Sequence, residues 1–127
     1  MIILKNEVFE SKIFMETIRN INESSELSAK VAYWFNRIVK ELQNRMVDYN
    51  ETRIKLIEKY GKLEKEHERY VIEEVNVEKW KNEFQDLLQQ EFTLPFSKQK
   101  FPDTIKISPL SINMLESIFD FSDIITE

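Results

Sequence analysis

"SELSAKVAYWFNRIVKELQNRMVDYNETRIKLIEKYG", residues 25–61, is the stretch that decides the fold. No proline or glycine interrupts it before Gly61, the only glycine among 127 residues. Its apolar side chains recur at helical spacings, first as a broad stripe and then as a narrow one: Leu27, Val31, Trp34, Phe35, Ile38, Val39 and Leu42, and then Met46, Tyr49, Leu56 and Tyr60. This periodicity predicts one amphipathic helix from Ser25 to Tyr60.

The length of this helix implies that its two ends lie in different surroundings. At 1.5 Å per residue it would be roughly 50 Å long, which is more than the diameter of a small domain. The broad stripe of the first half suits a globular core, whereas the narrow stripe of the far half suits contact with one other helix, from this chain or from a partner. We therefore expect Met46, Tyr49 and Leu56 to be partner-binding residues.

Gly61 is predicted to end the helix in a left-handed conformation, which glycine adopts at little cost because it lacks a β-carbon. The charged run "KLEKEHER" at 62–69 is then a connector. A short strand is expected at 68–72, because "ERYVI" is rich in β-branched and aromatic residues. Whether residues 62–75 form a hairpin or extend the helix stays open.

Shorter elements are expected on both sides of the long helix. They are a strand at 2–4, a helix capped by Asn6 and reaching Ile21, a helix over 77–90 capped by Asn76, strands at 91–94 and 104–107, and a helix capped by Ser108 that ends near Phe119. Short polar side chains cap helices by accepting from free N–H groups of the first turn, and Pro109 suits the first helical position. The predicted fold class is α+β, mainly α: a long helix packed by a shorter N-terminal helix, with two further helices and a small sheet of short strands.

The chain is expected to form a single domain over residues 1–127. In this prediction the long helical arm spans about 25–60, the compact end combines 1–24 with 68–119, and the tail is 120–127. Apolar side chains alternate with acidic ones where the last helix meets the tail; they are Phe119, Phe121, Ile124 and Ile125. Two interpretations stay open: these residues close the core, or they dock into a partner.

The charge distribution disfavours nucleic-acid binding. The net charge is −5, and residues 103–127 alone carry five acidic side chains and one basic one. A nucleic-acid binder normally shows the opposite balance, a basic face that neutralises phosphates. The chain has no cysteine for a disulfide or a thiolate site, and no apolar run approaches the roughly 20 residues of a membrane span. We expect a soluble protein without a membrane segment.

His67 is the only histidine, and it lies in an acidic run that resembles a metal site. The carboxylates around it are Glu64, Glu66, Glu68, Glu73 and Glu74. A second histidine at helical ligand spacing is missing, and such charge runs are more often solvated surface. A single glycine also excludes phosphate-binding and dinucleotide-binding loops. We therefore expect no catalytic residue, no cofactor-binding residue and no metal site, and a protein that is not an enzyme.

Four segments together resemble a known family. They are "LKNEVF", "RIKLIEKYG", "NVEKWKNEFQDLLQQEFTL" and "IKISPLSINMLESI". Their pattern, R-x-x-L-I-x-K-Y-G, then L-L-x-x-E-x-x-L, then I-x-L-[ST]-P, is similar to a family of small proteins of unassigned function encoded by tailed bacteriophages. Relatives often carry a D-E-N-G type turn after the glycine, which would make a hairpin. This chain has no such turn residues at 62–69.

The resemblance implies a phage gene product, and the far half of the long helix indicates protein–protein contacts. We expect a virion or assembly component or an accessory factor that forms a homo-oligomer, located in the host cytoplasm, with incorporation into the virion left open. The alternative is a phage-encoded inhibitor that binds a host defence or regulatory protein, with an acidic tail that imitates nucleic acid. A third hypothesis is a metal-dependent hydrolase around His67.

Overall fold

The computed structural model describes residues 1–103 and 105–122, and its dominant element is one long helix, α2 (Ala29–Tyr60). The Ser28 hydroxyl oxygen caps it by accepting a hydrogen bond from the Val31 N–H group. The predicted helix is confirmed as far as Tyr60, but it begins at Ala29 and not at Ser25. The residues before it form a turn, in which the Ser24 hydroxyl oxygen accepts from the Glu26 N–H group.

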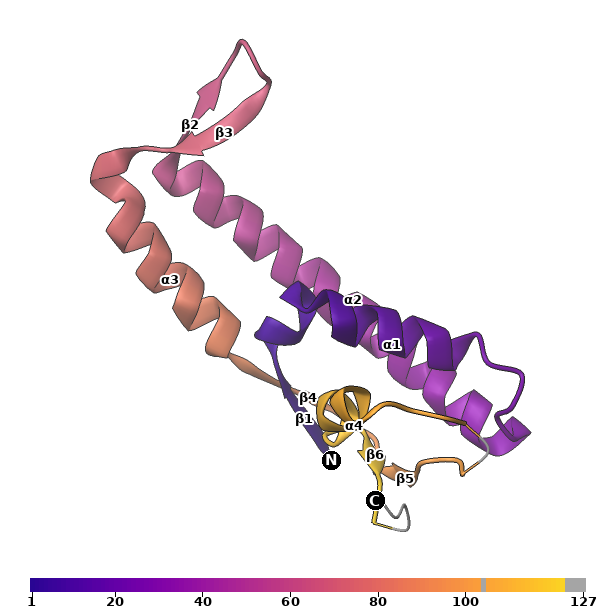
Figure 1. The fold of residues 1–127 in the computed structure, drawn as a ribbon. Helices are drawn as coiled ribbons and strands as arrows, with labels where there is room; N and C mark the ends of the chain where they lie inside the picture. Colours follow the sequence, from indigo (N-terminus) through magenta and orange to yellow (C-terminus); the bar gives the residue numbers. More distant parts are fainter. Residues whose placement is uncertain (104, 123–127) are drawn as a thin grey trace.

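Most of the shorter elements surround the first half of α2, as Figure 1 shows. The helical elements there are η1 (Asn6–Glu10), α1 (Lys12–Asn22) and α4 (Pro109–Leu115). The strands there are β1 (Ile2–Lys5), β4 (Glu91–Leu94), β5 (Gln99–Lys100) and β6 (Phe119–Asp120). β1 pairs antiparallel with β4, so that Ile2 lies opposite Leu94, and β5 pairs parallel with β6. We call this part of the molecule the compact end.

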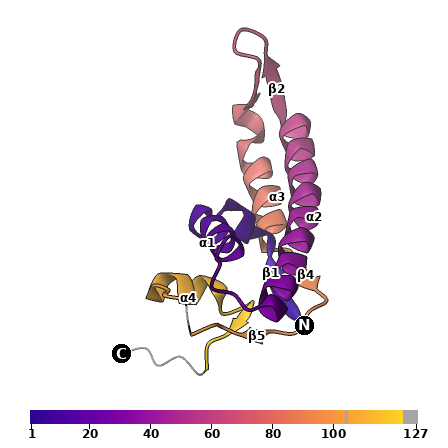
Figure 2. The ribbon, with the colours of Figure 1, turned by 90° about the vertical axis from the view of Figure 1, so that its right-hand side faces the viewer.

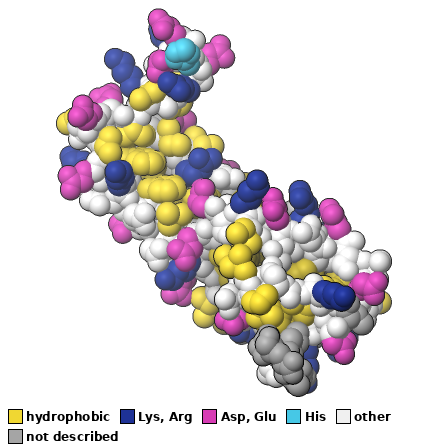
Figure 3. Space-filling view, viewed as in Figure 1, with side chains coloured by type: hydrophobic (Ala, Val, Ile, Leu, Met, Phe, Trp, Pro, Cys, Tyr) yellow, Lys and Arg dark blue, Asp and Glu magenta, His cyan; other side chains and the backbone are white. Residues whose placement is uncertain are grey.

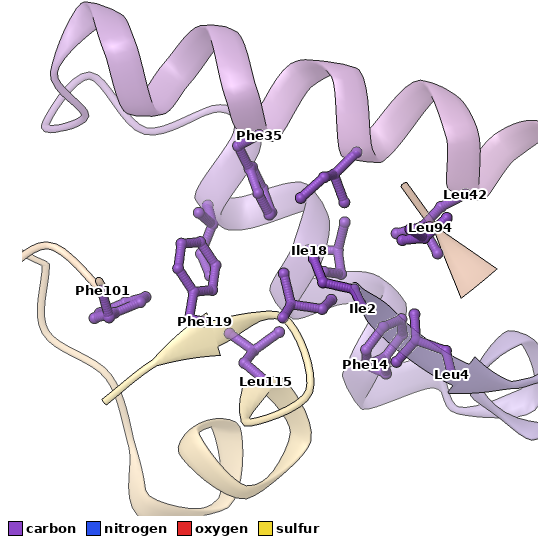
Figure 4. Packing of buried hydrophobic residues seen from close by; sticks show 13 residues of the cluster. Ile2, Leu4, Phe14, Ile18, Phe35, Leu42, Leu94, Phe101, Leu115 and Phe119 are labelled. Carbon is purple, nitrogen blue, oxygen red and sulfur yellow. The ribbon is translucent and has the colours of Figure 1, made fainter. Parts of the chain in front are cut away.

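The hydrophobic core lies in the compact end, between α2 and the surrounding elements (Figure 4). Its buried residues come from both ends of the chain: Ile2, Leu4, Phe14, Ile18, Ile21, Phe35, Ile38, Leu42, Leu94, Phe101, Leu115, Ile118 and Phe119. The Phe119 ring lies 5.3 Å from the Phe35 ring and 5.1 Å from the Phe101 ring, measured between centroids. The last strand is therefore part of the core.

The second half of α2 leaves the compact end and pairs with a helix of the same chain (Figures 1 and 2). After Tyr60 the chain forms a hairpin from β2 (Gly61–Glu64) and β3 (Arg69–Ile72), and then the 3₁₀ turn η2 (Glu74–Asn76). The helix α3 (Val77–Gln89) returns alongside α2 to the compact end. The structure thus places residues 68–89, which the predicted domain layout assigned to the compact end, beside the far half of α2. The predicted class, α+β and mainly α, is confirmed.

Of the two predicted asparagine caps, Asn6 is wrong, and Asn76 is the N-cap residue of α3 but makes no side-chain capping bond. Asn6 begins η1, and its amide nitrogen donates to the Leu87 carbonyl oxygen at 2.9 Å. Ser11 caps α1 instead, since its hydroxyl oxygen accepts from the Phe14 N–H group. Asn76 precedes α3 as expected, but its amide nitrogen donates to the Tyr60 carbonyl oxygen at 3.3 Å. Both asparagines therefore connect segments that are far apart in sequence.

The predicted strand at 104–107 is wrong for the residues described, 105–107. Ile105 and Ile107 pack against the core as half-buried side chains without strand pairing, because β5 and β6 pair with each other. The helix capped by Ser108 is confirmed, but α4 ends at Leu115 and Phe119 lies in β6. The apolar spacing of 115–119 therefore reflects burial after the helix has ended.

The predicted left-handed conformation of Gly61 is also wrong. Its backbone is extended, with φ −102° and ψ 167°, and it is the first residue of β2. Glycine is needed there for space, because a β-carbon would lie 2.5 Å from the Ile57 carbonyl oxygen. The hairpin forms although the expected turn residues are absent, and Glu68 takes the positive φ, 49°. Residues 62–75 therefore do not extend the helix.

Candidate partner-binding surface

Residues 50–86, which we call the distal segment, contain no buried side chain. The segment covers the end of α2, the hairpin, η2 and most of α3, and all of its residues are described. It nevertheless carries many large apolar side chains: Ile54, Leu56, Ile57, Tyr60, Leu63, Tyr70, Val71, Ile72, Val75, Val77, Trp80 and Phe84. Five of these side chains, Ile54, Leu63, Tyr70, Val71 and Val75, are exposed, and the other seven are half-buried. Exposed apolar side chains gathered in one segment mark an interaction surface.

The contact between α2 and α3 in this segment is only partly satisfied. Trp80 and Phe84 stack with their ring centroids 5.3 Å apart, and Lys59 Nζ lies 3.3 Å from Glu83 Oε1. Three polar atoms in the two helices are buried without a hydrogen-bond partner among the described residues: Arg53 Nε, Trp80 Nε1 and Glu83 Oε2. Buried polar atoms without partners weaken a contact. The two helices alone therefore make a weak pair.

Tyr60 interacts with both charged groups at this contact, Lys59 and Glu83. A hydrogen bond from Tyr60 lowers the pKa of the Glu83 carboxyl, and Lys59 lowers it further. Hydrogen bonding with Tyr60, followed by that with Glu83, raises the pKa of Lys59. Because both charged groups are solvent-exposed, the pair adds little to stability.

A row of exposed apolar residues lies on α2 beside its contact with α3. Val47 and Ile54 are 53% and 47% exposed. Since successive helical residues are about 100° apart, Ile54 lies about 100° around the helix from Arg53, whose Nε is buried, and about 60° from the half-buried Ile57. We call Val47 and Ile54 the outer stripe. Hydrophobic side chains also gather over α2 and α3 on the face shown in Figure 3.

The hairpin is amphipathic. Leu63 pairs with Tyr70 across the two strands, and Gly61 pairs with Ile72 on the same side. Leu63 and Tyr70 are 47% and 46% exposed, and we call them the hairpin face. The opposite side carries Lys62, Glu64 and Arg69 together with Val71, which is 41% exposed. An isolated two-stranded hairpin is marginally stable in water, so a covered hairpin face would stabilise it.

Charges of both signs border these two apolar surfaces. Glu51 and Glu58 lie beside Ile54 on α2, whereas Lys62 lies on the side of the hairpin opposite Leu63, and Lys65 lies in the turn. None of these four side chains forms an ion pair with any described residue; the pairs in the segment are Lys59–Glu83, His67–Glu64 and Arg69–Glu64. The outer stripe is therefore bordered by two acids that form no ion pair with a described residue.

The structure places the predicted partner-binding residues in different environments. Tyr49 and Phe119 are 3% and 1% exposed and belong to the interior. The Tyr49 hydroxyl donates to Glu10 at 2.5 Å, and burial, followed by this hydrogen bond, raises the Tyr49 pKa above its ordinary range. Leu56 is half-buried. Tyr49 and Phe119 therefore present no surface to a partner.

The remaining predicted residues lie at the compact end. Met46 lines a groove of about 500 Å³ between α1 and α2, together with Met15 and Val39. Phe121 packs on Phe101 with ring centroids 4.9 Å apart, so this part of the tail covers the core. Ile124 and Ile125 lie outside the described residues.

The sequence-based selection missed the outer stripe and the hairpin face. Val47 and Ile54 are two helical turns apart and form a second row beside the stripe that α3 covers. The signal for the hairpin face was the alternation in "GKLE" and "RYVI", which cannot be assigned to a face until the strands are known to pair.

The surroundings of His67 show a contact with one surface carboxylate. His67 Nε2 lies 3.3 Å from Glu64 Oε1 at the hairpin turn, with 60% of the histidine side chain exposed. Across residues 1–103 and 105–122, no group of three or more histidine, aspartate and glutamate side chains is arranged to hold a metal ion. Over the same residues, no helix combines the length and the apolar character needed to cross a bilayer.

Comparisons with known proteins identified no relative of this chain. Scans against protein-family models, curated proteins and solved structures found no match.

Proposed function

We propose that this protein acts through protein–protein contacts made by the distal segment, and that its first partner is another copy of itself. The observation that carries the proposal is the absence of any buried side chain over residues 50–86. Two helices and a hairpin have too few layers to enclose a core, so their apolar side chains need a further surface to cover them. A partner protein supplies such a surface.

The charge balance of the distal segment supports a protein partner. Residues 50–86 carry eight basic and ten acidic side chains. This near-neutral mixture lacks the basic excess that phosphate binding needs, and it permits two copies to approach each other without strong repulsion. The groove of about 500 Å³ lies at the compact end, away from the segment.

The resemblance to small tailed-phage proteins sets the biological context of the proposal. In that context an oligomer serves as a virion or assembly component or as an accessory factor in the host cytoplasm. The alternative is an inhibitor that covers the same surface with a host protein. The same apolar residues support both, and the mass of the purified protein separates them.

The test is the mass of the purified protein in solution, measured by sedimentation over a range of concentrations. We expect a multiple of the 15.3 kDa chain mass. Ile54→Lys should shift the protein toward the single-chain mass, because it places a charge in the outer stripe. Ile13→Lys is the matched control, since Ile13 is 45% exposed on α1 and Ile54 is 47% exposed on α2.

A single-chain mass at every concentration would contradict self-association. Pull-downs with wild-type, Ile54→Lys and Ile13→Lys baits then test the inhibitor alternative. A host protein retained by the wild type and by Ile13→Lys but lost by Ile54→Lys would support it. Equal retention by all three baits would argue against any role of the distal segment in binding.

A further inference from the structure

We propose that the far half of α2 in each copy binds in the groove between α1 and α2 of a second copy, with the two α2 helices antiparallel. This inference rests on the proposed function and specifies its geometry. Ile54 and Ile57 of one copy enter the groove of the other, and a two-fold axis repeats the contact. Reciprocal use of one surface is how two-fold dimers close.

The groove lies at the compact end and has an apolar lining. Its volume is about 500 Å³, and its lining combines the half-buried Met15, Val39 and Met46 with the buried Ile18 and Leu42. Methionine side chains adapt to the shape of a partner. Apolar grooves between helices bind the apolar face of another helix, which presents side chains at spacings such as i, i+4 and i+7.

The far half of α2 carries a row with this spacing on the side of the helix that lines the groove. Asn50, Ile54 and Ile57 are at positions i, i+4 and i+7; Ile54 is 47% exposed, and the other two are half-buried. Val39 and Ile57 are eighteen residues apart, which is about five complete turns, so both lie on one line along α2. Figure 1 shows that α1 lies along the first half of α2 and ends before the far half. The same side of α2 therefore forms a groove in one half and an uncovered ridge in the other.

An antiparallel alignment of two copies places this ridge over the groove. With a two-fold axis midway between Val39 and Ile57, Ile57 of one copy lies opposite Val39 of the other. Ile54 then lies beside Gln43, which also lines the groove. The ridge and the part of α2 that lines the groove each extend over seven residues, about 10.5 Å, so the two surfaces match in length.

Charge complementarity favours a second copy as the occupant. Lys40 and Glu58 are also eighteen residues apart and exposed, and neither forms an ion pair with a described residue. The same two-fold axis brings Lys40 of each copy within one helical turn of Glu58 of the other. Opposite charges at an interface rim set partner choice and register.

The other charges at the contact do not oppose it, because each surface is balanced. The charged residues of α1 that line the groove are Lys12, Glu16, Arg19 and Glu23. The charged residues on the far half of α2 from 50 to 58 are Glu51, Arg53, Lys55 and Glu58. Two bases and two acids in each set leave no net charge to repel the second copy.

Engineered cysteines test the alignment, since the chain has no cysteine of its own. Chains with Gln43→Cys and chains with Ile54→Cys, each with a different tag, are mixed after reduction and then mildly oxidised. Docking raises the effective concentration of the two thiols toward the millimolar range, so the mixed disulfide should form at least about tenfold faster than with Ile13→Cys in place of Gln43→Cys. Ile13 is the matched control because it is exposed and lies about 160° around α1 from Met15, outside the groove.

The Ile54→Cys variant alone supplies a second control. In the antiparallel dimer its two thiols are about 18 Å apart along the helices, because residue 54 lies opposite residue 42. The single variant should therefore cross-link more slowly than the mixture. Faster cross-linking of the single variant would mean that the two helices are parallel, and it would overturn the docking.

A charge exchange tests the register. Lys40→Glu alone and Glu58→Lys alone should each weaken association by about tenfold in the dissociation constant, since each brings like charges together twice in the dimer. The chain with both changes should associate as the wild type does, because the pairs form again with reversed sign. Circular dichroism of each variant checks that these exposed substitutions leave the fold in place.

The outcomes separate this inference from the proposed function. Oligomers in which Gln43 and Ile54 cross-link no faster than Ile13 and Ile54, or in which the double charge exchange restores nothing, would overturn the docking and leave self-association standing. A single-chain mass would overturn the docking, and together with no Ile54-dependent partner it would overturn both.

Discussion

The compact end and the distal segment share one helix but differ in how they are stabilised. In the first half of α2, Phe35, Ile38 and Leu42 are at most 2% exposed and touch elements from both ends of the chain. In the last turns of the same helix, no side chain after Tyr49 is buried. A continuous backbone therefore joins a region that has its own core to a region that needs a partner to acquire one.

This contrast predicts unequal effects for equal substitutions, and the largest effect belongs to the compact end. Phe35→Ala should lower the free energy of unfolding by about 3–5 kcal/mol, since it leaves a cavity in a packed core. Phe84→Ala removes a half-buried ring stacked on Trp80, so it should cost about 1 kcal/mol. Urea unfolding at one fixed protein concentration measures both. Equal losses in the free energy of unfolding would contradict this contrast, because they would mean that the distal segment is packed as well as the compact end.

The junction between α2 and the hairpin supplies an intermediate effect. Gly61→Ala should destabilise the protein by about 2 kcal/mol, because the new methyl group would press against backbone oxygens and the chain must shift to admit it. The contact distance is 2.5 Å to the Ile57 oxygen and 3.3 Å to the Val71 oxygen. Lys62→Ala, an exposed change in the same strand, is the control and should be nearly neutral.

The location of that strain sharpens the comparison. Amide hydrogen exchange should become faster in β2, β3 and the last turn of α2 in Gly61→Ala, with the core amides of α1 unaffected. Uniformly faster exchange would show that the two regions unfold as one unit. Unchanged amide exchange rates in the hairpin would show that the junction accommodates the added methyl group without strain.

How far the sequence predicts this molecule depends on whether a feature is local. The long helix as far as Tyr60 and the cap of α4 by Ser108 followed from periodicity and capping residues, although the left-handed cap expected at Gly61 does not form. The packing of Ile105 without a strand partner, the place of α3 and the contact of Asn6 with Leu87 depend on segments far apart in sequence. No local pattern carries that information.

The candidate surface shows the same limit. The narrow seam of the far half of α2 correctly indicated that it needs a second helix, and α3 supplies it. Leu56 is half-buried in this half of the helix, and Tyr49 is buried beside Phe9 and Glu10 of η1. The exposed apolar residues are therefore those of the neighbouring row, Val47 and Ile54. Sequence periodicity gives the faces of a helix but not which face its own chain will cover.

Tyr49 lies at the boundary between the two regions, and it provides the smallest and most specific test. Its hydroxyl donates to Glu10, so Tyr49→Phe should cost about 1 kcal/mol through loss of that hydrogen bond. Burial, and then Glu10, raise the Tyr49 pKa in the folded state. A raised pKa means that folding favours the neutral phenol. This contribution is complete below the unfolded pKa of about 10 and is lost as the pH rises above it, by at most about 1.4 kcal/mol per pH unit.

Urea unfolding at about pH 8 and about pH 11, on either side of the ordinary tyrosine pKa, tests that dependence. The wild type should lose more stability between the two than Tyr49→Phe, which has no phenol to titrate at this position. Tyr33→Phe is the matched control, because Tyr33 is 68% exposed on the same helix. Parallel losses in all three proteins would show that the boundary is open to solvent, and that the buried part of α2 ends before Tyr49.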